Sequence, residues 1–281
     1  MTTTSPQTPA QPSYWNQAGG QAWVDLQGLM DGLNQPIADA VIEAGFPGKG
    51  GCVLDIGCGA GTTTLDMARR LGPAGASVGV DVSAPLLDAA RAAAQAQGVA
   101  NAQFLEGDAQ TFDLGTAAYD AAISRFGVMF FADFDQAFAN LRRALKPGGK
   151  LAFVCWRSPA DNPLAGAPAD AAAPYLPPMP QPDLNAPGRW AFADPERVRG
   201  ILARTGWRDI EIAPLDVDTP IALPDLMTLS LRMGPLGARL QQADEATQAK
   251  VLAAMTDRLR ACEVDGKVAM TAACWLVTAR A

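Results

Sequence analysis

Residues 53–61 read VLDIGCGAG, and three threonines follow directly at positions 62–64. An apolar run that contains one acid ends here, and glycines then occupy every second position, at Gly57, Gly59 and Gly61. This pattern predicts a strand that ends in a tight turn and opens directly into a helix. Glycine lets the backbone approach a ligand where a Cβ would collide, and a helix start directs unpaired N–H groups and a positive dipole end at that ligand. The stretch therefore predicts a site for a bound, nucleotide-like small molecule.

The glycine spacing distinguishes two kinds of nucleotide site. The dinucleotide fingerprint G-x-G-x-x-G requires glycine at the sixth position counted from Gly57, and Thr62 stands there. The sequence from Asp55 to Gly61 instead reads D-x-G-x-G-x-G. This string resembles motif I of the class I S-adenosylmethionine (SAM) dependent methyltransferases. The alternative is a glycine-rich turn between a strand and a helix that binds no ligand.

Two further strings carry the resemblance. SRFGVMFF at residues 124–131 and LKPGGKLAF at residues 145–153 are similar to the ubiquinone-biosynthesis-type, small-molecule branch of these enzymes. The resemblance covers about residues 50–156, and the flanks match only in layout. It implies that Asp55 orients the glycine turn near the methionine part of SAM. It also implies that the turn itself holds the cofactor, through Gly57, Cys58, Gly59 and Gly61.

Strand and helix patterns alternate along the middle of the chain. Strands are expected at residues 51–56, 77–81, 102–106, 119–124 and 150–156, with helices at 62–71, 84–97 and 134–145. Such alternation predicts parallel βαβ units with right-handed crossovers, and hence an α/β fold class. The resemblance implies a Rossmann-like, mostly parallel seven-stranded sheet. Its antiparallel last strand would come from a late hairpin, with strands at 208–212 and 267–278, and would insert beside the fifth strand.

The chain is expected to divide into five parts. These are a disordered leader (1–12), an N-terminal helical cap (13–48), a SAM-binding Rossmann-like core (49–156), a lid insertion (157–191) and a C-terminal part of the core sheet (192–281) with a helical insertion (224–262). The cap is predicted to break near Gly19–Gly20 and at Gln35–Pro36. The lid is rich in proline and alanine without a clear period, which is typical of a functional loop or a linker.

Three acids are expected along one rim of the sheet, because Asp55 ends the first strand, Asp81 ends the second and Asp108 follows the third. Ligands of open α/β sheets bind beyond the carboxyl ends of the strands. The resemblance implies that Asp81, beside Val82, binds the ribose diol, to which a carboxylate with two acceptor oxygens is suited. It implies that Asp108, between Gly107 and Ala109, takes the adenine amino group. The alternatives are a helix-entry acid at Asp81 and a simple turn at Gly107–Asp108.

The end of the fourth strand supplies further candidates. Family members use backbone groups here to hold the methionine amino end, which makes Ser124 a cofactor candidate. Arg125 could face a carboxylate of substrate or cofactor, or pair with a nearby acid. Arg125, Phe126, Phe130 and Trp156 are candidate substrate contacts, and core packing is the alternative for the aromatic rings.

Aromatic residues also occur near the start of the chain. Tyr14 and Trp15, with Trp23, resemble the aromatic cap that class I enzymes place over the cofactor. Aromatic residues at helical spacing also pack in cores, so both interpretations stand.

Composition excludes several classes of protein. The 281 residues carry a net charge of −7, which argues against a nucleic-acid partner because phosphate binding needs a Lys/Arg surface. No segment approaches the roughly 18 apolar residues of a membrane helix, and residues 1–12 lack the features of a signal peptide. The expected location is cytoplasmic, without a membrane partner.

The chain contains no histidine, which removes the usual general base and the commonest metal ligand. The five cysteines have no metal-binding or disulfide spacing, so no metal is expected. Methyl transfer from a sulfonium needs neither a histidine nor a metal, because the leaving group is already activated. Any deprotonation must use Asp, Glu, Tyr, Lys, Cys or solvent.

These observations lead to one functional hypothesis. The chain is expected to be a SAM-dependent methyltransferase that moves a methyl group to an O, N or C nucleophile of a small-molecule substrate by in-line displacement. S-adenosylhomocysteine would be released, and the enzyme would be a monomer or homodimer. The alternatives are a catalytically idle SAM-binding interaction protein and an arsenic or thiol methyltransferase. An NAD-dependent oxidoreductase is opposed by Thr62 and by the lack of histidine.

Overall fold

Seven strands form one sheet in the order β3-β2-β1-β4-β5-β9-β6. The computed structural model describes residues 15, 16, 18–178 and 183–281. The strands are β1 (Cys52–Ile56), β2 (Ala76–Asp81), β3 (Ala102–Glu106), β4 (Tyr119–Arg125), β5 (Leu145–Trp156), β6 (Arg208–Asp218) and β9 (Thr271–Arg280). β1 to β5 run parallel, and β9 lies antiparallel between β5 and β6. The predicted Rossmann-like fold class, with its antiparallel strand beside the fifth, is confirmed.

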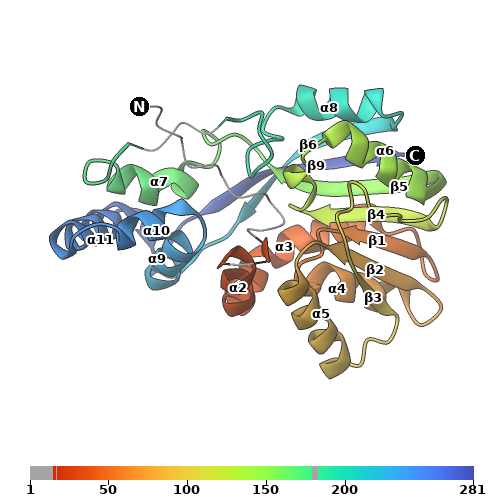
Figure 1. Ribbon diagram of the computed structural model, residues 1–281, viewed down its shortest axis with the longest axis horizontal. Coiled ribbons are helices and arrows are strands. Elements are labelled where there is room, and N and C mark those ends of the chain that lie inside the picture. Colours follow the sequence, from red (N-terminus) through yellow and green to blue (C-terminus); the bar gives the residue numbers. More distant parts are fainter. Residues whose placement is uncertain (1–14, 17, 179–182) are drawn as a thin grey trace, which may run out of the picture.

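Helices cover both faces of this sheet (Figure 1). On one face, α3 (Gln27–Gly45) and α4 (Thr62–Leu71) pack Ile37, Val41 and Met67 against Val53 and Ile123. α5 (Ala84–Ala96) packs beside α4. The other face is covered by α6 (Phe134–Ala144) and α8 (Pro195–Arg204), whose buried side chains belong to the cluster around Leu54 and Ile56. Apolar burial on both faces explains why the central strands read as nearly continuous hydrophobic runs.

The two-residue period of β1 determines where its acid lies. Leu54 and Ile56 belong to one core cluster and Val53 belongs to the other, so successive side chains alternate between the faces. Asp55 therefore lies on the face of Val53, which is the face that α3 and α4 cover. A carboxylate on this face is buried beneath the first turn of α4.

The N-terminal helices differ from the sequence prediction. α2 (Ala18–Asp25) runs through Gly19–Gly20, and α3 continues through Pro36, so both predicted breaks were wrong. The interruption falls at Leu26 instead. Proline inside a helix removes a hydrogen bond to the carbonyl four residues earlier. Here Gly32 and Pro36 are both exposed, so water can satisfy that carbonyl and the helix persists.

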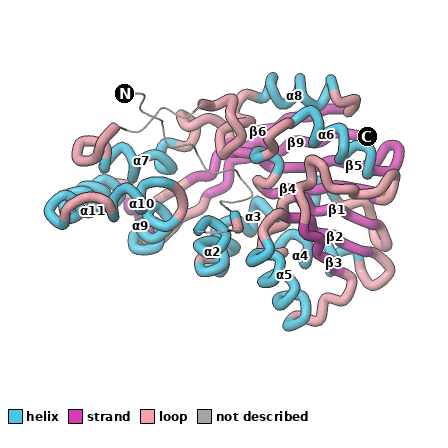
Figure 2. Tube along the Cα trace, in the orientation of Figure 1, coloured by secondary structure: helices cyan, strands magenta, loops and turns pink. Residues whose placement is uncertain are grey.

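A group of helices lies beyond the far ends of β6 and β9, which extend past the other strands (Figures 1 and 2). We call it the helical lobe, and it consists of α7 (Pro163–Ala172), α9 (Leu223–Arg232), α10 (Pro235–Gln241) and α11 (Glu245–Arg260). A short hairpin of β7 (Glu263–Val264) and β8 (Lys267–Val268) accompanies it. The predicted helical insertion at 224–262 is therefore three helices, and the predicted strand at 267–278 is divided between β8 and β9.

The segment predicted as a lid without regular structure contains α7. Pro163 stands in the first turn of this helix, where the missing N–H costs nothing. The proline and alanine content hid the helix, because an internal Pro168 argues against one. α7 packs on α10 and α11 through a shared apolar cluster that includes Ala172, Leu240 and Met255.

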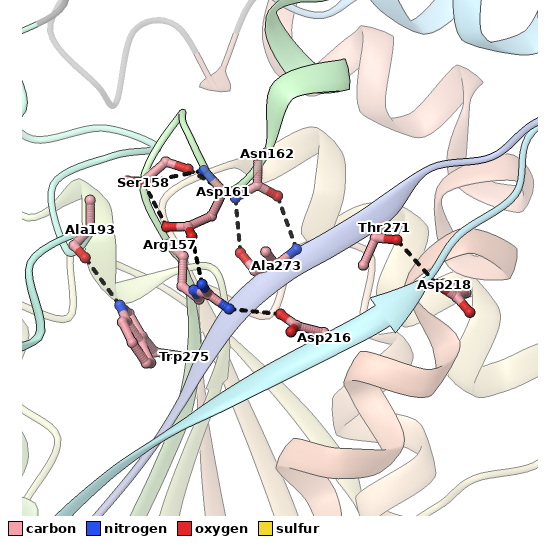
Figure 3. Close-up of polar contacts among 10 residues, drawn as sticks. All are labelled: Arg157, Ser158, Asp161, Asn162, Ala193, Asp216, Asp218, Thr271, Ala273 and Trp275. Carbon is pink, nitrogen blue, oxygen red and sulfur yellow. Dashed lines mark hydrogen bonds and ion pairs between the residues drawn. The ribbon is translucent and has the colours of Figure 1, made fainter. Parts of the chain in front are cut away.

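Both ends of residues 157–191 are attached to β9 (Figure 3). The Asn162 side chain donates to the Ala273 carbonyl at 3.0 Å and accepts from the Ala273 N–H at 2.9 Å. Arg157 forms ion pairs with Asp161 at 2.5 Å and Asp216 at 2.9 Å. Beyond the other end, the Trp275 Nε1–H donates to the Ala193 carbonyl at 3.1 Å. The segment is therefore connected to the sheet at both ends.

We predict that Asn162→Leu lowers the free energy of unfolding by about 1–3 kcal/mol, because it leaves the buried N–H and carbonyl of Ala273 without their side-chain partner. Denaturant unfolding of the purified protein measures this change. Thr271→Val is the matched control on the same strand, since it removes an exposed 3.1 Å hydrogen bond to Asp218 (Figure 3). The control should change stability by less than about 0.5 kcal/mol. Equal effects of the two substitutions would contradict the assigned role of Asn162.

Candidate active site

A cavity of about 1470 Å³ lies beyond the carboxyl ends of β1, β2, β4 and β5. Its walls come from the ends of these strands, from α2 and α3, and from the helical lobe. The sequence-predicted residues that line it are Trp15, Gly57, Cys58, Gly59, Asp81, Val82, Gly107, Asp108, Ala109, Arg125, Phe126, Phe130 and Trp156. Asp55, Gly61 and Ser124 do not line it, and Tyr14 lies outside the described residues.

The three glycines of the turn adopt positive φ angles of 63° at Gly57, 54° at Gly59 and 87° at Gly61. A Cβ at Gly57 would lie 2.8 Å from Gly127 Cα, and a Cβ at Gly61 would lie 2.9 Å from Ala90 Cβ. At Gly59, no atom of the described residues beyond its two chain neighbours lies within 4 Å of the position that a Cβ would take. The outer glycines therefore permit close packing, whereas Gly59 leaves open space where a ligand can approach the backbone.

Asp81 stands at the end of β2 with one side open to the cavity. Its Oδ2 accepts from the Gly59 N–H at 2.8 Å and its Oδ1 accepts from the Ser83 N–H at 2.9 Å. Burial raises the pKa of Asp81, and the backbone N–H donors oppose that shift. Each oxygen has one protein donor and can accept a further hydrogen bond, which is the requirement for binding a diol.

Asp55 lies beneath the turn and not in the cavity wall. Its Oδ2 accepts from the hydroxyls of Thr63 and Thr64, both at 2.6 Å. Its Oδ1 is buried and has no hydrogen-bond partner within the described chain. Burial raises the pKa of this carboxyl, while the two threonine hydroxyls and the charge of Arg125 act in the opposite direction. The acid therefore connects β1 to the first turn of α4.

The loop after β3 forms another part of the wall. Asp108 Oδ1 accepts from the Gln110 N–H at 2.9 Å, so the side chain stabilises its own turn. The loop position also lines the cavity, together with Gly107 and Ala109. The turn hydrogen bond uses only one oxygen of Asp108, so adenine binding by the other oxygen stays a prediction.

The first described residues are bound to the loop after β2. Asn16 donates through Nδ2 to the Val82 carbonyl at 2.8 Å and accepts the Ala84 N–H through Oδ1 at 3.0 Å. The Ser83 hydroxyl donates to the Trp15 carbonyl at 2.8 Å. The Trp15 ring then makes edge contacts with Phe130 at 5.8 Å and with Trp23 at 6.1 Å between ring centroids. These contacts place an aromatic cover on the cavity.

The two polar candidates after β4 have different surroundings. The Ser124 hydroxyl is fully buried, donating to the Ile56 carbonyl at 2.7 Å and accepting from the Gly127 N–H at 3.1 Å. Arg125 lines the cavity and lies 3.5 Å from an Asp31 oxygen. One of its terminal nitrogens, Nη1, is buried without a partner in the described chain. Ser124 thus joins the strand ends, and Arg125 keeps a donor for a ligand.

Aromatic rings form the wall next to Arg125. Phe126, whose φ is 67°, stacks on Trp156 with the rings 7° from parallel and 4.7 Å between centroids. Trp156 ends β5 and lines the cavity with Phe126 and Phe130. A side chain other than glycine adopts such a φ at an energetic cost, and such strain clusters at functional sites.

Comparisons with known proteins identify the family of this chain. Residues 53–149 match the family model described as a methyltransferase domain. The demethylmenaquinone methyltransferase of Deinococcus radiodurans is 31% identical over 170 residues, which cover 56% of this chain and 67% of that protein. The chain belongs to the SAM-dependent methyltransferase family.

Other relatives are matched over different shares of their length. The nocamycin O-methyltransferase of Saccharothrix syringae is 27% identical over 73% of this chain and 76% of its own. The match with this chain covers only 40% to 54% of the length of several further relatives. A SAM complex of Haemonchus contortus phosphoethanolamine N-methyltransferase 2 has a TM-score of 0.59 at 16% identity, covering 99% of this chain and 61% of that one. That likeness shows the fold.

Several lining residues of this methyltransferase were missed by sequence reasoning. They come from the helical lobe and its loops, and they include Leu164, Ala169, Arg189, Leu226, Leu229, Ser230, Met233 and Arg258. The helical period of residues 224–262 gave a signal for α9, but not for which face lines the cavity. Tyr175 and Trp190 are the aromatic residues of the segment that contains Arg189, and neither indicated which of its side chains line the cavity.

We predict that Asp55→Asn weakens S-adenosylhomocysteine binding about tenfold or more, because the neutral amide removes a buried negative charge close to the cofactor turn. Calorimetric titration measures the affinity. Asp88→Asn, which changes a carboxylate that is 77% exposed on α5, serves as the control and should bind like the wild type. Unchanged affinity in a folded Asp55→Asn variant would exclude this role.

We expect Asp55→Asn to keep or raise the stability of the folded protein, although it weakens ligand binding. Because burial raises the folded-state pKa of Asp55, its ionised form destabilises the folded protein at neutral pH, and this penalty disappears as the pH falls below the folded-state pKa. Asp55→Asn should therefore unfold at a denaturant concentration equal to or above that of the wild type at neutral pH. The difference should shrink on acidification. A large loss of stability at neutral pH would contradict this account.

Proposed function

We propose that the protein transfers the methyl group of SAM to an apolar small-molecule acceptor within this cavity. The observation that carries the proposal is that a single cavity joins the glycine turn and Asp81 to a largely apolar wall from the helical lobe. Its volume of about 1470 Å³ exceeds the roughly 300–1,000 Å³ of ordinary ligand pockets, which leaves room for cofactor and acceptor together.

The positions of the polar groups support one orientation of the cofactor. Asp81 would accept hydrogen bonds from the ribose hydroxyls, and the loop around Asp108 and Ala109 would bind the adenine. The methionine part would lie along the turn from Gly57 to Gly61. Arg125 would offer its unpartnered Nη1 to the methionine carboxylate, as a charge-assisted hydrogen bond. Trp15 would cover the cofactor from the N-terminal side.

The reaction requires little from the protein beyond holding SAM and the acceptor in the correct relative position. SAM supplies an activated methyl group, and the acceptor atom displaces it in line from the sulfonium. The residues around the cavity align the two molecules and exclude water, which can supply a large share of the barrier reduction. Aromatic and aliphatic walls at Trp156, Leu229 and Met233 favour an acceptor with an apolar skeleton.

The proposal also covers the class of acceptor, the location and the oligomeric state. The net charge of −7 favours a small-molecule acceptor over a nucleic acid. No helix among the described residues has the length and apolarity to cross a bilayer. The same residues contain no group of three or more potential metal ligands. A cytoplasmic location and a monomeric or homodimeric state belong to this proposal.

Incubation with methyl-labelled SAM tests the reaction directly. We expect label to appear in an organic-extractable product when the protein is given an extract of apolar metabolites, with stoichiometric formation of S-adenosylhomocysteine. A Gly59→Val variant is the control, since its side chain would occupy the open space beside the turn. Tight SAM binding without label transfer to any acceptor would support an idle SAM-binding protein instead.

We predict that Asp81→Ala reduces affinity for SAM about tenfold or more, because two ribose hydroxyls lose a charged acceptor and such hydrogen bonds are worth roughly 1.5–3 kcal/mol. Calorimetry with SAM and S-adenosylhomocysteine gives the measurement, with circular dichroism to establish folding. NAD should give no binding heat with the wild type. Unaltered SAM affinity in folded Asp81→Ala would remove this residue from the site.

A further inference from the structure

Arg189 differs from the other arginines that pack over aromatic rings. Within the described residues there are four such arginines, at positions 70, 157, 189 and 197. Arg70 pairs with Glu43, Arg157 pairs with two aspartates, and Arg197 donates to Asn185 at 2.9 Å. The Arg189 guanidinium has no ion pair or hydrogen bond to the described part of the chain.

The surroundings of Arg189 are aromatic and belong to the cavity. Its Cζ lies 4.1 Å from the ring centroid of Trp156 and 4.9 Å from that of Trp190, and all three side chains line the cavity. The guanidinium is open to cavity solvent, yet the enclosing walls lower its pKa to about 10 by desolvation. It stays charged at neutral pH, so the cavity contains a cation that no carboxylate of the described residues neutralises.

The loop that carries Arg189 is held on both sides. The Gly188 N–H donates to the Met129 carbonyl at 2.9 Å, next to the cofactor side of the cavity. On the other side, Trp275 holds the Ala193 carbonyl (Figure 3). These bonds place the backbone of the loop, and the two tryptophan rings orient the side chain. The guanidinium is therefore positioned before any ligand arrives, which lowers the entropic cost of binding.

The other charged groups of the cavity have different partners. Arg125 lies beside Asp31, and Arg258 contacts the Cys262 sulfur at 3.2 Å. Asp81 and Asp108 accept backbone hydrogen bonds from their own loops. Asp170 on α7 lines the cavity without an ion pair to Arg189. Two arginines of the cavity, Arg189 and Arg258, thus have no carboxylate partner among the described residues. Of these two, Arg189 is the one that lies over Trp156, at the end of β5.

We propose that the acceptor is an apolar molecule that carries a negatively charged oxygen group, and that Arg189 binds this group. A guanidinium over an aromatic face can hold a carboxylate through two parallel N–H donors, while the rings contact the apolar skeleton beside it. This inference rests on the proposed function and specifies the chemical class of its acceptor. Arg189 would thereby select acids over neutral molecules of the same shape.

A matched pair of fluorescent probes tests the proposal without knowledge of the natural acceptor. 2-Naphthoate and 2-naphthylmethanol share one ring system, and only the first is charged at neutral pH. Each is titrated into the protein saturated with S-adenosylhomocysteine, at constant ionic strength. We expect the anion to bind about tenfold more tightly than the alcohol, the range given by one charge-assisted hydrogen-bonded pair. Equal affinity for the two probes would overturn the proposal.

Three variants assign the preference to a residue. Arg189→Gln should abolish the preference for the anion and leave the affinity for the alcohol nearly unchanged, and Arg189→Lys should restore part of it. Arg260→Gln is the charge-matched control on α11, with a side chain that is 64% exposed, and it should behave like the wild type. If Arg258→Gln abolishes the preference while Arg189→Gln does not, the assignment to Arg189 is wrong.

The affinity for S-adenosylhomocysteine separates this proposal from the function on which it rests. We expect Arg189→Gln to bind S-adenosylhomocysteine as the wild type does, since Arg125 would serve the methionine carboxylate. A fall of tenfold or more would place Arg189 at the cofactor and overturn its role with the acceptor. Failure of the wild type to bind S-adenosylhomocysteine would instead contradict the proposed function itself.

Discussion

The buried carboxylate of Asp55 connects the sheet to its cofactor turn. One oxygen accepts from two adjacent threonine hydroxyls at 2.6 Å, so the end of β1 and the start of α4 cannot separate without leaving a buried acid unpaired. The glycine turn lies between these two elements. The turn has positive φ angles at its three glycines, open space beside Gly59, and a hydrogen bond from the Gly59 N–H to Asp81. Asp55, the start of α4, the glycine turn and Asp81 are thus joined by hydrogen bonds into one unit.

β9 is the second element on which the arrangement of the molecule depends. It pairs with β5 and β6 along the sheet, and the backbone of its Ala273 binds the Asn162 side chain at the point where the helical lobe begins. Next to this point, Arg157 forms an ion pair with Asp216 of β6. The wall of the cavity opposite the cofactor is therefore placed by the same strand that completes the core. This arrangement explains how a segment rich in proline and alanine can form a defined wall, since its ends are positioned by hydrogen bonds and ion pairs.

Sequence reasoning succeeded where the information is local. The spacing of Gly57, Gly59 and Gly61 predicted the turn, and alternating patterns predicted the parallel βαβ units, while the antiparallel strand beside the fifth came from the family resemblance. It failed where distant contacts decide the outcome. α3 tolerates Pro36 because that face meets water, and α7 forms because α10 and α11 cover its apolar side. The Ser124 hydroxyl is satisfied by Ile56 and Gly127, so a cofactor contact at Ser124 stays a prediction that concerns its backbone groups. Arg189 has no sequence signal, because only the fold brings Trp156 to it.

The position of β9 between β5 and β6 has a consequence for folding. β5 ends at residue 156 and β9 begins at residue 271, so the pair that completes the sheet closes a loop of more than 100 residues. Until the ribosome has synthesised residue 280, β5 remains an unpaired edge, and β6 has no partner at all in the sheet. Long-range strand pairing is slow, and exposed edges promote association between chains. The half-made molecule therefore passes through a stage in which the edge of β5 is open to pairing with another chain.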